Sequence, residues 1–258
     1  MEKNTIKWAM YLNYFVFAIL LNSVGIVILK AQRNYGVDEL EASILEAFKD
    51  LPIAIVSFLV ASFLPRIGYK RAMLIGLGLV YMACITMYFG NSFATAKLLF
   101  ATVGVSFALI KVSVYSLIGT VTENQQEHNS LMSSIEGVFM IGIALAYFLF
   151  PAFNSETNPD AWLNVYWLLA GISGVSFAFL FLAKSENQVE VPGVNLLDDF
   201  RQMFQLMAKL LTIVFVISAF LFVMIEQGIM SWLPTFNSNV LHLPENISIM
   251  MASILAIS

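Results

Sequence analysis

Six largely apolar runs of about 20 residues each follow one another within the first 183 residues of the chain. A helix needs about 20 apolar residues to cross a bilayer, whereas a transmembrane β-strand needs about 10 residues that alternate in polarity. Only helices and closed barrels satisfy their backbone hydrogen bonds in lipid. The runs therefore predict an all-α polytopic membrane protein with spans at residues Trp8–Leu29, Leu40–Leu64, Ala72–Phe89, Ala96–Val121, Ser130–Phe150 and Leu163–Leu182.

The composition agrees with a protein that lies in lipid. Hydrophobic residues make up 59% of the chain and charged residues 12%, about half the charged fraction of a typical soluble domain. The bases form no stripe that would suit nucleic acid. The single cysteine, Cys84, has no partner for an internal disulfide, and His128 and His242 lie far apart without neighbouring ligands. We therefore expect no metal site, no cofactor and no nucleic-acid partner.

The chain continues beyond the sixth run. A seventh run, Leu206–Leu233, is expected to stop at Pro234, and the apolar segment Ile247–Ser258 is too short to cross a bilayer. We expect a six-helix transmembrane bundle at 1–183, a cytoplasmic linker with a short surface helix at 184–205, and the truncated start of a second bundle at 206–258. A seven-span protein with a short apolar tail is the alternative.

The distribution of basic residues predicts the orientation. Positively charged residues concentrate in cytoplasmic loops. With a cytoplasmic N-terminus, three bases lie outside, Lys30, Arg33 and Lys97, and eight lie inside: Lys3, Lys7, Arg66, Lys70, Arg71, Lys184, Arg201 and Lys209. This bias favours a cytoplasmic N-terminus.

Ionisable residues within the spans are candidates for function, because placing one at membrane depth costs about 2.5–3.5 kcal/mol. The third and sixth spans have none, which predicts that they are outer, lipid-facing helices. The candidates in the other spans are Glu46, Lys49, Asp50, Lys111, Glu136 and Glu226.

Their depths suggest two groups. Lys49 can lean toward the outer surface and pair with Glu46, one turn earlier. Lys111 leans toward the bilayer centre, where we expect its ammonium near the depth of Asp50 and Glu136. This cluster either serves substrate or proton transfer or is an ion pair that only holds helices together.

Three amides also lie within the spans. Asn13 and Asn22 belong to the first span, and Gln227 follows Glu226 in the seventh. They either contact the substrate or hydrogen-bond to neighbouring helices.

The loop between the second and third spans resembles a motif of the major facilitator superfamily. That family carries Gly-x-x-x-Asp-Arg-x-Gly-Arg-Lys there, and this chain has Ala-Ser-Phe-Leu-Pro-Arg-Ile-Gly-Tyr-Lys-Arg at 61–71. Ala61 and Pro65 depart from the pattern, and the matching positions are Arg66, Gly68, Lys70 and Arg71. The segment Gly228–Pro234 is similar to the seventh helix of sugar and fucose-permease-like members.

The resemblance implies two six-helix bundles that expose a central site to each side of the membrane in turn. It implies a secondary transporter or symporter for a sugar or organic anion in a plasma membrane, in bacteria the inner membrane, with protons as a further partner. The first, fourth and seventh spans would line the path, and Arg66, Gly68, Lys70 and Arg71 would form a gating loop. The site residues on the path would be Asn13, Asn22, Lys111, Glu226 and Gln227, with Asp50 and Glu136 beside it.

Two other classes compete with a transporter. A seven-helix receptor or sensor agrees with the span count but places its N-terminus outside, against the basic residues. A membrane-embedded enzyme would need a nucleophile, a metal or an acid–base pair at one membrane face. Neither histidine lies within a span, so we do not expect an enzyme.

Overall fold

The computed structural model describes residues 2–155, 157–182 and 205–257. Every regular element within these ranges is a helix, which confirms the predicted all-α class. The elements are α1 (Glu2–Asn22), α2 (Val24–Tyr35), α3 (Glu39–Ile67), α4 (Tyr69–Gly90), α5 (Phe93–Val121), α6 (Gln125–Ala152), the 3-10 helix η1 (Ala161–Asn164), α7 (Val165–Leu182), α9 (Leu210–Asn239) and α10 (Glu245–Ile257). The expected linker at 184–205, with its surface helix, lies almost entirely outside the described residues.

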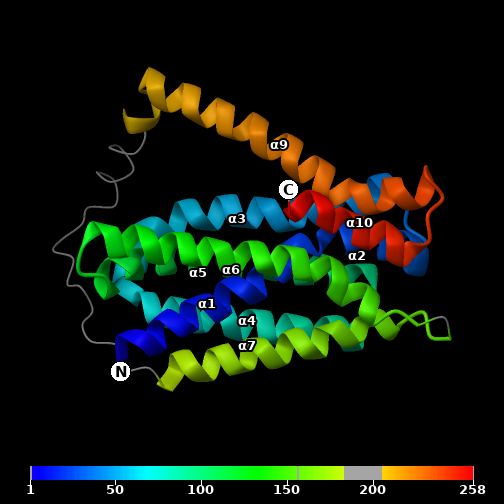
Figure 1. The fold of residues 1–258 in the computed structure, drawn as a ribbon, viewed down its shortest axis with the longest axis horizontal. Helices are drawn as coiled ribbons and strands as arrows, with labels where there is room; N and C mark the ends of the chain where they lie inside the picture. Colours follow the sequence, from blue (N-terminus) through cyan, green and yellow to red (C-terminus); the bar gives the residue numbers. More distant parts are fainter. Residues whose placement is uncertain (1, 156, 183–204, 258) are drawn as a thin grey trace.

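Most helices lie side by side as long rods with two common ends (Figure 1). We call the end with the N-terminus and the start of α9 the near end. The far end holds the α2–α3, α4–α5, α6–α7 and α9–α10 connections. By length and composition, five described helices could cross a membrane, or six if α1 and α2 form one span.

Polar caps begin several of these helices. The Asp38 carboxylate accepts a hydrogen bond from the backbone N–H of Glu41 at 2.7 Å at the start of α3. Ser92 and Thr95 form a reciprocal capping box on α5. Each cap satisfies backbone donors that the first turn leaves free, and this fixes where the spans begin.

The first predicted span is not one continuous helix. It bends by 41° between α1 and α2, at Ser23. The Ser23 hydroxyl donates to the carbonyl of Leu20 at 2.7 Å and the Asn22 amide donates to that of Ala18 at 2.9 Å. Side chains that bond to carbonyls of the preceding turn compete with the helical ladder and bend it.

The seventh span was wrongly expected to stop at Pro234. Helix α9 continues five residues further, to Asn239. A proline removes one backbone donor and bends a helix, but neighbouring contacts can hold the next turn in place. Here Pro234 and Thr235 are buried at the far end, which stabilises that turn.

Close packing of α3 on α5 depends on a glycine. A Cβ atom on Gly104 would lie 2.3 Å from the carbonyl oxygen of Lys49. Small residues allow helix backbones to approach in this way within a membrane. The contact fixes α3 against α5 at the depth of Lys49.

Helix α9 contacts the bundle over only part of its length. Its buried residues all lie between Met230 and Ser238, and none of its most apolar 18-residue window is buried. In Figure 1 it meets α2 and α10 at the far end and diverges from α3 toward the near end, while α4 and α7 lie on the opposite side of the molecule. The bundle thus exposes its α9 side at the near end.

Candidate functional site

Lys111 lies between two aromatic rings of its own helix. On α5, Phe107 and Tyr115 come one turn before and one turn after it, and its Nζ is 5.7 Å and 6.0 Å from their ring centroids. The side chain is exposed. Because both rings present electron-rich faces to an ammonium group, they hold it in place without neutralising its charge.

Glu136 on α6 completes this group of residues. Its Oε1 accepts a hydrogen bond from the Tyr115 hydroxyl at 2.5 Å. Tyr14 of α1 lies beside it, with its ring centroid 6.3 Å from that of Tyr115 and 5.8 Å from that of Phe139. We call Tyr14, Phe107, Lys111, Tyr115, Glu136 and Phe139 the lysine–glutamate cluster.

The cluster lies near the middle of its helices. Lys111 is ten residues before the end of α5, and Glu136 is eleven residues after the start of α6. Both are therefore roughly 15 Å from the near end at 1.5 Å per residue. The expected match in depth between Lys111 and Glu136 is found.

Asp50 does not join this cluster. Its backbone neighbour Lys49 packs on Gly104, which precedes Lys111 by seven residues, or about 10 Å along α5. The Asp50 carboxylate lies 3.4 Å from the Lys49 ammonium. The expectation that Asp50 approaches Lys111 is wrong, because Asp50 is nearer the far end.

The expected partner of Lys49 is also wrong. Its ammonium, in a residue only 3% exposed, lies 3.4 Å from Asp50 and donates to the Gln227 side-chain oxygen, also at 3.4 Å. A buried Glu46 oxygen has no hydrogen-bond partner among the residues that the structure describes. Lys49 therefore joins α3 to α9 through the Gln227 amide, while Asp50 rather than Glu46 is the nearby carboxylate of its own helix.

The remaining predicted polar residues make no hydrogen bond or ion pair with the cluster among the described residues. Asn13 is fully buried and donates to the Ala9 carbonyl at 2.7 Å, and its own side-chain oxygen has no partner. Asn22 lies at the bend of the first span. Glu226 is half-buried on α9, and no base lies within ion-pair distance of it in the described part of the chain.

The gating-loop residues lie where α3 ends and α4 begins, at the near end. Gly68 joins the two helices with a φ of 91°, which a residue with a side chain rarely adopts. The Lys70 ammonium donates to the Phe181 carbonyl at 3.1 Å, at the end of α7, and Arg71 is exposed. The side chain of Arg66 lies outside the described part.

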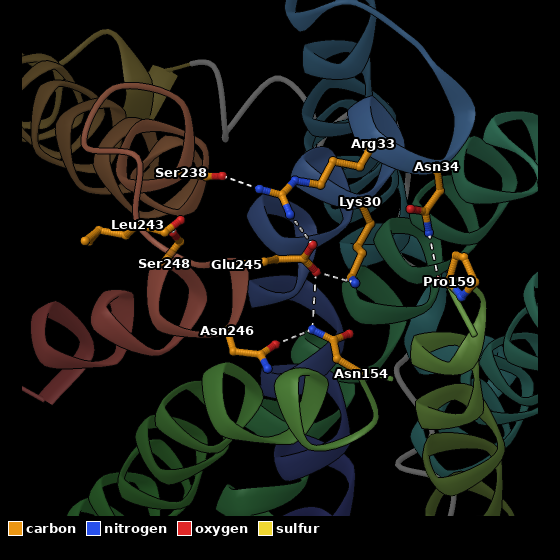
Figure 2. Close-up of polar contacts among 10 residues, drawn as sticks. All are labelled: Lys30, Arg33, Asn34, Asn154, Pro159, Ser238, Leu243, Glu245, Asn246 and Ser248. Carbon is orange, nitrogen blue, oxygen red and sulfur yellow. Dashed lines mark hydrogen bonds and ion pairs between the residues drawn. The ribbon is translucent and has the colours of Figure 1, made fainter. Parts of the chain in front are cut away.

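The far end carries an ion cluster that the sequence analysis missed (Figure 2). Glu245 at the start of α10 pairs with Lys30 of α2 and, at 2.5 Å, with Arg33. Arg33 also donates to the Ser238 hydroxyl at 2.5 Å, and the Asn154 amide at the end of α6 donates to Glu245 at 3.2 Å. We call these five residues the far-end latch, because they join α9 and α10 to the first bundle.

The latch is partly shielded from solvent. The Lys30 side chain is 7% exposed, and its ammonium lies 5.9 Å from the centroid of the Trp162 ring. A pocket of about 340 Å³ lies beside it, with Asn34, Ser155 and Pro159 on its wall. A buried cation needs a counter-ion. The Lys30 ammonium therefore stabilises the position of Glu245 when α10 packs on the first bundle.

A close backbone contact accompanies the latch. A Cβ atom on Gly25 of α2 would lie 2.5 Å from the carbonyl oxygen of Ser231 and 2.9 Å from its Cα. The Tyr147 hydroxyl of α6 contacts the Met230 sulfur at 3.7 Å. The far end is therefore closed by packing as well as by charge.

Part of the candidate site could have been found from spacing alone. Phe107 and Tyr115 lie four residues either side of Lys111, so a helix brings all three onto one face. Tyr14 carries no such signal, because its approach to Tyr115 depends on how α1 crosses α5. The same is true of the latch, in which Arg33 contacts residues more than 200 positions further along the chain.

The model of one protein family matches most of the chain. This family is described as the Major Facilitator Superfamily, and the match covers residues 10–258. A search of curated proteins gives no match.

A solved structure shares the fold. It is described as the crystal structure of a D-xylose–proton symporter, with a TM-score of 0.66 and 13% sequence identity over 100% of this chain. The chain covers 66% of that structure's chain, or about two thirds of its length. At this identity the likeness concerns the fold alone. With the family match over residues 10–258, it identifies the chain as an integral membrane protein of the Major Facilitator Superfamily.

Proposed function

We propose that the protein is a secondary active transporter of a small polar solute, a sugar or an organic anion, that works by alternating access in a plasma membrane. One observation carries the proposal: α9 and α10 close on the first bundle at the far end, and α9 diverges from it toward the near end. The lysine–glutamate cluster lies between these ends. A site that is closed on one side and accessible from the other is what alternating access requires.

The proposal is tested with the full-length protein in proteoliposomes. Uptake of a labelled panel of sugars and hydroxy acids would be measured with an inward proton gradient, without one, and with an ionophore that collapses it. We expect uptake of one compound class above that of empty vesicles, with accumulation only under the gradient. Failure of every compound to cross, from a protein that binds one of them, would contradict transport.

Glu136 is the proposed proton carrier. Its carboxylate faces the Tyr115 hydroxyl directly, with Tyr14 and Lys111 as the other titratable groups of the cluster. Glu136→Gln keeps the shape and still accepts the tyrosine hydrogen bond, but it cannot release a proton. We expect gradient-driven accumulation to fall at least tenfold, while exchange of labelled for unlabelled solute continues.

The control for this variant is Glu41→Gln, which removes an exposed carboxylate in the first turn of α3, outside the cluster. It should accumulate solute within about twofold of the wild type. Equal losses in both variants, or accumulation by Glu136→Gln at the wild-type level, would show that Glu136 does not carry the coupling proton.

The proposed orientation puts the near end in the cytoplasm. After Cys84→Ser, single cysteines at two exposed positions, Gln126 at the near end and Thr157 at the far end, report on it. An impermeant maleimide applied to intact cells should label Thr157→Cys and leave Gln126→Cys unlabelled until the cells are opened. The opposite pattern would reverse the orientation.

A further inference from the structure

We propose that the transported solute carries a carboxylate and that Lys111 binds it. The inference rests on the proposed function and narrows its substrate from a polar solute to a small hydroxycarboxylate or sugar acid. Its basis is an exposed lysine at membrane depth with no carboxylate within ion-pair distance among the described residues.

Lys111 has no counter-ion within ion-pair distance in the part of the chain that the structure describes. No carboxylate lies within 4 Å of its ammonium among the described residues, where Lys7, Lys30, Arg33 and Lys49 each have an acidic partner. The carboxylates expected to neutralise it are engaged elsewhere, Glu136 with Tyr115 and Asp50 with Lys49. A charge far from both membrane surfaces needs compensation, and a neutral sugar would leave it uncompensated.

The position of Lys111 on α5 makes it accessible to a solute. Ser106 and Ile110 of α5 face Gly76 of α4. Lys111 follows these residues by five and by one, so it points roughly 100–140° away from α4 at 3.6 residues per turn. It therefore faces away from the side of the molecule formed by α4 and α7, and its side chain is exposed.

The surrounding groups suit an organic acid better than a bare inorganic anion. The Tyr14 hydroxyl, in a residue only 1% exposed, is buried beside Tyr115 without a hydrogen-bond partner of ordinary geometry. A solute oxygen that reached this hydroxyl would accept a hydrogen bond from it. The half-buried ring of Tyr115 offers apolar contact for the carbon chain of the same solute.

A binding measurement tests this inference independently of transport. The thermal midpoint of the purified full-length protein would be measured with three matched pairs, gluconate and sorbitol, galacturonate and galactose, and lactate and propane-1,2-diol. A compound that binds only the folded state raises the midpoint, and at equal concentration the tighter ligand raises it further. We expect at least one acid to stabilise the protein and to bind at least tenfold more tightly than its neutral partner.

Variants assign the effect to Lys111. Lys111→Met should weaken binding of that acid at least tenfold, and Lys111→Arg should restore most of it, because the guanidinium keeps the charge. The control is Lys97→Met, which removes another α5 lysine held over a ring, at 4.7 Å from the Phe93 centroid. It should bind the acid as the wild type does.

Several results would overturn the inference. Preferential binding of the neutral partners, or no stabilisation by any of the acids, would exclude the proposed solute class. Unchanged affinity in Lys111→Met would exclude the residue. A folding defect in Lys111→Met that Glu136→Gln repairs would make the two a structural pair. Acid binding without uptake in proteoliposomes would contradict the proposed function and leave the anion site standing.

Discussion

Replacing Gly25 with leucine should abolish uptake, with a loss of at least tenfold, while the protein still folds in the membrane. Even the Cβ atom would lie 2.5 Å from the Ser231 carbonyl oxygen. The contact is with backbone, so no side-chain rotation relieves it and α2 and α9 must separate. Buried Thr235 of α9 reports on this: after Thr235→Cys and Cys84→Ser, a maleimide applied to the far end should react at least tenfold faster in Gly25→Leu.

The matched control is Gly171→Leu. Gly171 is exposed on α7, and nothing lies within 4 Å of a Cβ atom placed there, so uptake and labelling should equal those of the parent. If Gly25→Leu transported at the control rate with Thr235→Cys still protected, closure at the far end would not depend on the contact between α2 and α9.

The sequence predicted most of the fold because apolar length is a local property. The six runs and the seventh correspond to described helices, and the bilayer thickness that sets their length applies to any chain. The bend in the first span was missed, since Asn22 and Ser23 occur in straight helices as well. Pro234 was overinterpreted, because packing at the far end continues α9 beyond it.

The sequence predicted only those features of the candidate site that follow from how deep a residue lies along its helix. Lys111 and Glu136 were placed at one level by counting residues from helix ends, and the structure agrees. Asp50 was misplaced because the same count was made from the far end without the contact between Gly104 and Lys49. The Lys49 ammonium donates to Gln227 and not to Glu46, because the neighbouring helix α9 places an acceptor 3.4 Å from it.

The far-end latch could not be predicted from one sequence. The sequence places Lys30 and Arg33 among the outside bases, and it gives no signal that singles out Glu245. Their approach depends on how the two parts of the chain close on each other, which no local pattern records. Because the closed form buries Lys30 beside Glu245, one substitution in the latch should change how often the far end opens.

Glu245→Gln should raise the ratio of the open to the closed form of the far end by about 30- to 150-fold. The change leaves the Lys30 ammonium, 7% exposed, without its counter-ion in the closed form. Breaking a buried ion pair costs about 3–5 kcal/mol. Because the Glu245 side chain is 19% exposed and that of Arg33 is 40% exposed, we expect roughly 2–3 kcal/mol, which corresponds to this change at 1.4 kcal/mol per tenfold. Labelling of Thr235→Cys measures it.

Two comparisons separate the loss of this charge pair from a general loosening. Adding Lys30→Met to Glu245→Gln removes the stranded cation, and labelling should return most of the way to the parent rate. Glu127→Gln breaks a more exposed pair at the near end, where the Lys7 ammonium lies 2.9 Å from Glu127, and should leave far-end labelling unchanged. If Glu245→Gln behaves like Glu127→Gln, packing around Gly25 and Ser231 alone closes the far end.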